Sequence, residues 1–309
     1  MPVRITDHPV AGTGHAITVC RIAGARPGPV LALTGGIHGD EAEGPLVLSE
    51  LIRSLDPGRL AGTLLVAPLC NPDAAAARRR ESPSDGKNLA RVFPGDPAGS
   101  PTEAMAAILT REVIAPADAL IDLHSGGSTI DCAPFAGYAD QPGGPGARAG
   151  ALARAFGAPA VWRHPPPVAP GRTLSVAWER GIPAIYLEAG GGLAPREEVL
   201  ALYRRGLRRA LVHLGHLEGR NDAVEQVFLA GPGDLDHAVA APVRGLVTAH
   251  VRPMQALARG ETAFTIRDLA GRVSAEVAAP VAGIAVFVRS ARWVEAGALL
   301  MALALPDPG

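Results

Sequence analysis

The chain is poor in cysteine, in lysine and in long apolar runs. Its three cysteines, Cys20, Cys70 and Cys132, do not have the spacing of a thiolate metal site, and an odd number cannot all pair as disulfides. We therefore expect a reduced, cytoplasmic environment. No apolar run approaches the roughly 18 residues of a transmembrane helix, and the first residues do not join a basic segment to an apolar one. Neither a membrane span nor a secretory signal is expected.

A strong net charge is also absent. Lysine and arginine number 29, aspartate and glutamate number 30, and the formal net charge is −1. This balance gives no reason to expect nucleic acid or a membrane surface as a partner. Apolar residues make up 48% of the 309 residues, which is enough for a large core and a second, smaller domain.

Residues 1–222 alternate short apolar runs with amphipathic segments. This alternation predicts an α/β domain with a mostly parallel, mixed sheet flanked by helices. The segments that we expect to form its strands are Val30–Leu33, Gly62–Pro68, Ala119–Leu123 and Pro183–Glu188.

Residues 223–309 have a different pattern, with short β-like runs and an internal repeat. Residues 240–246 (AAPVRGL) are echoed by residues 278–284 (AAPVAGI). Two similar units predict a small C-terminal β sandwich or barrel domain. Its second unit resembles half of a biotinyl or lipoyl carrier domain, but the only lysine of the chain is Lys87. A carrier role on a modified lysine is therefore excluded.

The stretch Gly35–Gly44 (GGIHGDEAEG) follows an apolar strand and contains His38 and Glu41. Pro45 is tolerated in the first turn of a helix, so we expect a helix to begin near Glu43. An imidazole and a carboxylate at the carboxyl end of a strand can face one point, as a zinc ion requires. The motif is short, and a capped turn with solvated side chains is an alternative.

A second histidine follows another apolar strand. His124 comes directly after Ala119–Leu123 and precedes Ser125 and two glycines. His38, Glu41 and His124 with an open fourth position form the ligand set of a hydrolytic zinc site, so we expect one zinc ion per chain. Asp122 shares a strand face with His124 and is a candidate partner for its imidazole.

Glu188 ends a third apolar strand and precedes a run of glycines. A carboxylate in this position is a candidate general base beside the metal. A capping or ion-pair role is an equal alternative on the sequence alone.

Five motifs occur in the order GGIHGDEAEGP, NPDAAAARRR, NLARVFPG, IDLHSGG and IYLEAGG. Together they resemble the succinylglutamate desuccinylase/aspartoacylase family, over about residues 30–305. The resemblance implies a zinc carboxypeptidase-like amidohydrolase with a β-rich C-terminal domain. It also implies His38, Glu41 and His124 as zinc ligands and Glu188 as general base.

The same resemblance implies a set of substrate-binding residues. Arg80 and Arg91 match the arginines of the family, and their guanidiniums suit a substrate carboxylate or the scissile carbonyl. Asn88 is retained, whereas Ala90 replaces the second asparagine of the family motif. We expect Arg172 to supply part of the missing contact.

The sequence thus predicts a zinc-dependent hydrolase that cleaves the amide of a small N-acylated amino acid or related amine. Its motifs are most similar to the N-acetyl-diaminobutyrate deacetylase branch. A metallocarboxypeptidase acting on small peptides and a metal-dependent binding protein without turnover are the alternatives. The acyl group, the amine and a homo-oligomeric state are left open.

Overall fold

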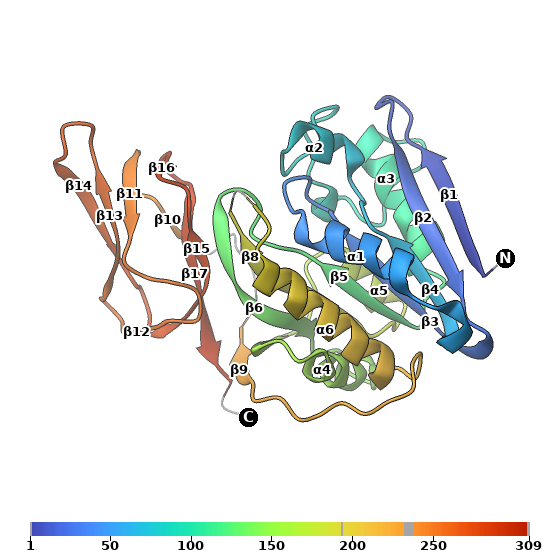
Figure 1. Ribbon diagram of the computed structural model, residues 1–309. Helices are drawn as coiled ribbons and strands as arrows, with labels where there is room; N and C mark the ends of the chain where they lie inside the picture. The colour runs from blue at the N-terminus through green and yellow to red at the C-terminus, as the bar shows by residue number, and fades with distance from the viewer. Residues whose placement is uncertain (1, 193, 232–237, 308–309) are drawn as a thin grey trace.

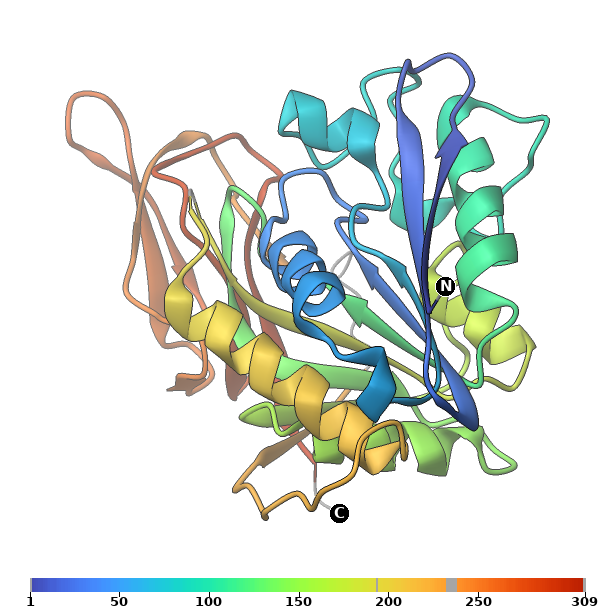
Figure 2. The same cartoon turned by 45° about the vertical axis from the view of Figure 1, so that its right-hand side comes forward.

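The computed structural model describes residues 2–192, 194–231 and 238–307. These residues form a mixed α/β protein with a 13-stranded mixed sheet and a separate four-stranded antiparallel sheet. Figures 1 and 2 show helices on both sides of the first part of the large sheet and β strands alone at the C-terminal end of the molecule.

The path of the large sheet runs in the order β1-β2-β4-β3-β5-β8-β6-β7-β9-β17-β15-β12, with β10 paired to β17. Its strands are β1 (Val3–Pro9), β2 (Ala16–Ala23), β3 (Arg26–Gly35), β4 (Ala61–Ala67), β5 (Ala119–Leu123), β6 (Ile130–Ala139), β7 (Ala160–His164), β8 (Ala184–Gly191), β9 (Val227–Ala230), β10 (Val239–Ala240), β12 (Ala256–Leu257), β15 (Gly283–Arg289) and β17 (Leu299–Pro306). The four-stranded sheet consists of β11 (Gly245–Ala249), β13 (Thr262–Arg267), β14 (Val273–Ala278) and β16 (Trp293–Val294).

Two groups of helices cover the two faces of the large sheet. Helices α1, α4 and α6 share one apolar core with the sheet, which includes Leu48, Phe156 and Tyr203. Helices α3 and α5 share the other core, which includes Met105 and Val176. The helices are α1 (Glu43–Ser54), α2 (Pro72–Ala77), α3 (Pro101–Leu109), α4 (Pro145–Phe156), α5 (Thr173–Glu179) and α6 (Glu197–His213), with short helical turns η1 (Pro57–Arg59), η2 (Leu89–Arg91) and η3 (Thr110–Ile114).

Strands β3, β5 and β8 are parallel neighbours in the middle of the large sheet. Leu123 of β5 pairs with Gly35 of β3 and with Leu187 of β8. The carboxyl ends of the three strands therefore lie side by side. In a parallel sheet covered on both faces, this edge is where polar side chains can reach a cleft.

Strand β6 connects the helical part of the molecule to the C-terminal strands. One edge of β6 pairs with β8, and its other edge pairs first with β15 and then with β7. Because β7 pairs with β9, β9 with β17, and β17 with β15, these five strands close into a ring. Phe135, Trp162, Leu229 and Phe287 belong to the apolar core that these strands share.

This pairing corrects part of the sequence-based expectation for residues 223–309. We expected their strands to form a unit apart from the α/β sheet, but β9, β15 and β17 are hydrogen-bonded into it. Among the described residues after 222, only β11, β13, β14 and β16 form strands outside the large sheet. The division into two domains at residues 222 and 223 stays a prediction, because a shared sheet does not decide whether the two parts fold independently.

Candidate metal centre and substrate cavity

His38 and Glu41 lie on the turn between β3 and α1. The Nδ1 atom of His38 lies 2.7 Å from Oε1 of Glu41, and both side chains are buried. Asn71, at the start of α2, supports this turn, because its Nδ2 contacts the carbonyl oxygen of Ile37 at 3.5 Å. The expected start of the following helix near Glu43 is confirmed.

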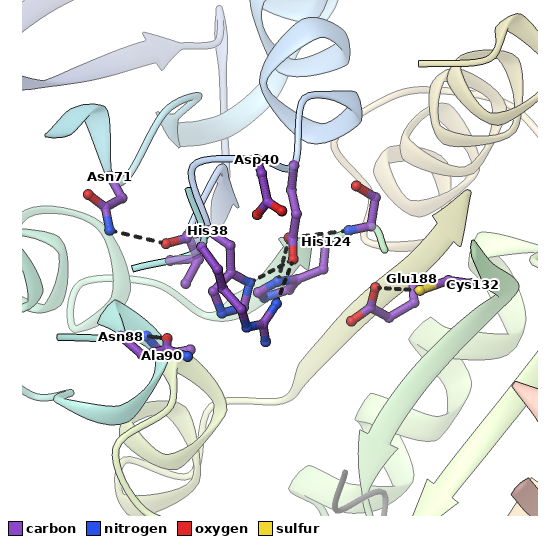
Figure 3. Close-up of polar contacts among 12 residues, drawn as sticks. His38, Asp40, Asn71, Asn88, Ala90, His124, Cys132 and Glu188 are labelled. Atoms are coloured by element: carbon purple, nitrogen blue, oxygen red, sulfur yellow. Dashed lines mark hydrogen bonds and ion pairs between the residues drawn. The ribbon is translucent and has the colours of Figure 1, made fainter. Parts of the chain in front are cut away.

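His124 reaches the same point from the end of β5. Its Nδ1 atom lies 3.0 Å from Oε2 of Glu41, and its Nε2 atom lies 3.1 Å from Oδ2 of Asp122. Both partners are carboxylates, which only accept, so each ring nitrogen donates when the imidazole is protonated. A metal ion held beside Glu41 would take the Nδ1 lone pair and leave the hydrogen on Nε2, which then donates to Asp122. The rings of His38 and His124 lie close together (Figure 3). Their centroids are 5.2 Å apart.

The donor set of this group suits a divalent cation. One ligand atom from each of His38, Glu41 and His124 lies within 4.8 Å of the others. Burial acts to raise the pKa of Glu41, but the two imidazoles outweigh it and hold this pKa well below its usual range. The Nε2 atom of His38 is buried and has no hydrogen-bond partner among the described residues. Buried, ionised and incompletely paired donors of this kind fit a metal site.

The two histidines differ in their electrostatic surroundings. Burial lowers the pKa of His38, and the contact with Glu41 compensates only in part. For His124, burial acts in the same direction, but Asp122 and Glu41 outweigh it and raise its pKa well above the usual value. The contact between Asp122 and His124 agrees with the partner that the sequence indicated.

Glu188 lies on β8, beside the metal group. Its backbone pairs with Phe135 of β6, and Cys132 of the same strand donates its thiol hydrogen to Oε2 at 3.6 Å (Figure 3). Burial and the charge of Glu41 raise the pKa of Glu188 to about 8. The described contacts do not include a helix cap or a salt bridge for this carboxylate, so they do not favour those alternatives.

A cavity of about 400 Å³ opens beside the metal group. Its lining includes His38, His124 and Glu188, and it also includes three guanidinium groups, from Arg80, Arg91 and Arg172. The Nη1 atom of Arg80 lies 3.4 Å from Oε1 of Glu41. The structure therefore brings these three predicted arginines to one space with the metal group.

The turn η2 and the segment before α5 are joined across this cavity. The backbone nitrogen of Phe93 donates to the carbonyl oxygen of Gly171 at 3.1 Å. Gly171 has φ +80°, and a Cβ there would lie 2.3 Å from the carbonyl oxygen of Arg91. Only glycine permits this close approach, which sets Arg91 and Arg172 on neighbouring walls.

Asn88 occupies a different position from the one that we expected. It does not belong to the described cavity lining, whereas Ala90 does. The Oδ1 atom of Asn88 accepts a hydrogen bond from the backbone nitrogen of Ala90 at 2.9 Å and caps η2. Its direct contact with a substrate stays a prediction.

The sequence did not indicate three other lining residues, His164, Tyr186 and Phe287. The Nδ1 atom of His164 lies 2.8 Å from the carbonyl oxygen of Gly231, so Nδ1 carries the hydrogen and Nε2 accepts from the Tyr186 hydroxyl at 2.8 Å. Burial lowers the pKa of His164 to about 4. His164 is therefore uncharged near neutral pH, and the nearby charge of Arg172 acts in the same direction as burial.

The fold and this group of side chains define a metal-dependent hydrolase. The family model of the succinylglutamate desuccinylase/aspartoacylase catalytic domain matches residues 27–214. The chain belongs to this family and is a metal-dependent deacylase, an amidohydrolase.

Relatives with similar sequences and structures agree with this assignment. N-alpha-acetyl-L-2,4-diaminobutyric acid deacetylase of Halomonas elongata is 36% identical over 249 residues, which cover 78% of this chain and 71% of that protein. The product-bound ectoine utilization protein EutE (DoeB) of Ruegeria pomeroyi has a TM-score of 0.89 and 30% identity, with 98% of this chain and 95% of that chain covered. A succinylglutamate desuccinylase/aspartoacylase of Rhodobacter sphaeroides also has a TM-score of 0.89, with 27% identity and 99% and 96% coverage.

Among the helices of the described residues, none is both long and apolar enough to cross a membrane.

Proposed function

We propose that this chain is a zinc-dependent deacylase that hydrolyses the amide bond of a small N-acylated amino acid. N-acetylated 2,4-diaminobutyrate is the first substrate to test, because one similar protein is by name an N-alpha-acetyl-L-2,4-diaminobutyric acid deacetylase. The observation that carries the proposal is a single cavity lined by two histidines of the metal group, the carboxylates of Asp122 and Glu188, and three guanidiniums.

His38, Glu41 and His124 hold the zinc ion in this proposal. A zinc ion at such a site supplies Lewis acidity and lowers the pKa of water towards ~7. Glu188 takes a proton from the attacking water and passes it to the leaving amine. The pKa of Glu188 is about 8, which is close to neutral pH, so both proton transfers are feasible. A cation at the metal group would lower this pKa from about 8 and favour the ionised carboxylate.

The arginines bind and polarise the substrate. A guanidinium can hold a carboxylate through two parallel hydrogen bonds, and it stabilises negative charge on a carbonyl oxygen. Arg80 lies against Glu41 of the metal group, so we assign it to the scissile carbonyl. Arg91 and Arg172, on neighbouring walls, are assigned to the carboxylate.

A substrate panel tests the proposal. Zinc-loaded protein is incubated with N-acetyl-L-2,4-diaminobutyrate, with N-acetyl, N-succinyl and N-formyl amino acids, and with dipeptides, and the released amine is quantified. Chelator-treated protein and the His124→Ala variant are the controls. Turnover of acylated amino acids but not of dipeptides is expected. Dipeptide turnover would favour the peptidase alternative, and no turnover with full zinc occupancy would favour a binding protein.

A further inference from the structure

The carboxylate of Asp122 accepts three hydrogen bonds. Oδ1 accepts from the Thr34 hydroxyl at 2.7 Å, and Oδ2 accepts from the Thr173 hydroxyl at 2.6 Å. Oδ2 also contacts Nε2 of His124 at 3.1 Å. All four side chains are buried. The orientation of the His124 imidazole therefore depends on Asp122, and that of Asp122 on two threonines.

The two threonines belong to different parts of the molecule. Thr34 lies within β3, where its backbone pairs with both β4 and β5. Thr173 is the first residue of α5 and follows Arg172 and the proline-rich segment 165–170, which line the cavity. Thr173 and His124 contact the same carboxylate oxygen, so Asp122 cannot rotate away from one without disturbing the other.

Ser175 makes local contacts at the start of α5. The Ser175 hydroxyl accepts from the backbone nitrogen of Arg172 and donates to its carbonyl oxygen. The hydrogen bond from the Thr173 hydroxyl to Asp122, in contrast, reaches the metal group.

We propose that Thr173 is a positioning residue that couples the metal group to the substrate-facing segment 165–172. Through Asp122, an ordered His124 fixes the Thr173 hydroxyl and with it the start of α5. The same link places Arg172 relative to the metal group. Coupling between two binding sites is reciprocal, so a ligand that orders this segment strengthens metal binding by the same factor. The inference rests on the proposed function only in taking the cavity as the substrate site.

Two isosteric substitutions separate coupling from simple support of Asp122. Thr173→Val and Thr34→Val each replace one buried hydroxyl by a methyl group and remove one donor from the same carboxylate. Zinc affinity is measured by competition with a chelator. We expect both variants to bind zinc more weakly, by roughly 10-fold, the lower end of what is lost when a partner of a metal ligand is removed.

Amide hydrogen exchange at residues 168–178 gives the deciding readout without any substrate. In the wild type and in Thr34→Val, saturating zinc is expected to slow exchange in this segment. In Thr173→Val, saturating zinc leaves exchange there unchanged. Thr173→Ser, which keeps the hydroxyl, restores the response to zinc. If zinc slowed exchange equally in Thr173→Val and Thr34→Val, the proposal would be overturned. If Thr173→Val does not fold, Thr173→Ala replaces it in the comparison.

Kinetics on N-acetyl-L-2,4-diaminobutyrate test the consequence for substrate binding. At saturating zinc, Thr173→Val is expected to raise KM at least about 5-fold more than Thr34→Val, on the scale of typical coupling between two sites. Equal KM values would contradict the link to Arg172. If the wild type does not hydrolyse this compound, the proposed substrate is wrong, and the exchange comparison still decides the role of Thr173.

Discussion

Replacement of Glu188 by glutamine tests the chemistry of the site most directly. Glutamine is nearly isosteric, so the pairing of this residue with Phe135 across β8 and β6 is preserved. Its amide cannot take a proton from water. We expect the Glu188→Gln variant to keep its fold and its zinc and to lose at least ~10²-fold in turnover, the contribution of a general base. This loss corresponds to about 2.7 kcal/mol of transition-state stabilisation.

The surroundings of Glu188 support a loss of turnover of at least this size. Burial first, and then the charge of Glu41, raise its pKa from the ordinary 4.5 to about 8, against the opposing charges of His124 and Arg80. Proton transfer is most effective when the pKa of the base lies near the working pH. The Cys132 thiol binds one carboxylate oxygen, Oε2, so Oε1 is the oxygen assigned to the proton transfer.

Glu43 provides a matched control. It is a buried carboxylate near the same sheet edge, and its Oε2 accepts from the Ser125 hydroxyl at 2.6 Å. The Glu43→Gln variant is expected to lose stability but to keep turnover within a few-fold, since hydrogen bonds to charged groups contribute about 1.5–3 kcal/mol.

The assays are zinc content, melting temperature and amine release on the substrate that the panel identifies. Near-normal turnover in Glu188→Gln would remove Glu188 from the mechanism. Loss of zinc together with activity would instead indicate direct ligation, and lower stability with activity kept would indicate a structural role.

Three further outcomes are expected. Metal analysis of His124→Ala should show a large loss of zinc, and unchanged occupancy would refute the ligand assignment. Near pH 7 the free site holds a proton on Glu188, whose pKa is about 8, and an added cation lowers that pKa. Zinc binding should therefore release up to ~1 proton more from the wild type than from Glu188→Gln, as calorimetry in buffers of different ionisation enthalpy would measure. The pKa of buried His164 is lowered from 6.5 to about 4, so the unfolded chain takes up a proton in this window that the folded chain does not. Stability should fall by up to ~3 kcal/mol as the pH drops from about 6.5 to about 4, and urea unfolding of His164→Gln should lack this part of the loss.

Local sequence signals were sufficient to predict where the site-bearing strands end. β3 ends at Gly35, three residues before His38, and β5 ends at Leu123, directly before His124, so the sheet edge that carries both histidines could be predicted. Pro45 likewise located the start of α1. These features depend on backbone restrictions and on burial within a few residues, which a single sequence records.

The partners of the C-terminal strands could not be predicted in the same way. The repeat in residues 223–309 indicated β structure, but β15 pairs with β6 and β9 pairs with β7. Which strand edges remain open depends on how the preceding sheet is assembled. Strand periodicity specifies a face of the sheet and not a neighbour.

His164 could have been found by the rule that found His124. Ala160, Val161 and Trp162 form a buried strand, and His164 stands at its end. In the sequence, the three prolines at residues 165–167 follow directly and obscure the strand. Asn88 is the reverse case, since a motif indicated substrate binding and the observed contact is a cap of η2. A motif identifies residues of a site without specifying what each contacts.

Phe287 connects the C-terminal strands to the candidate site. It lies on β15, pairs with Cys132 of β6 and lines the cavity. Its ring also packs edge-on against Phe135, whose backbone pairs with Glu188. Residues before 222 supply every candidate ligand and the candidate base, whereas β15 supplies part of the wall that confines them. Because β15 is held in the same ring of strands as β6, the position of this wall is fixed relative to Glu188 by backbone hydrogen bonds and a shared apolar core.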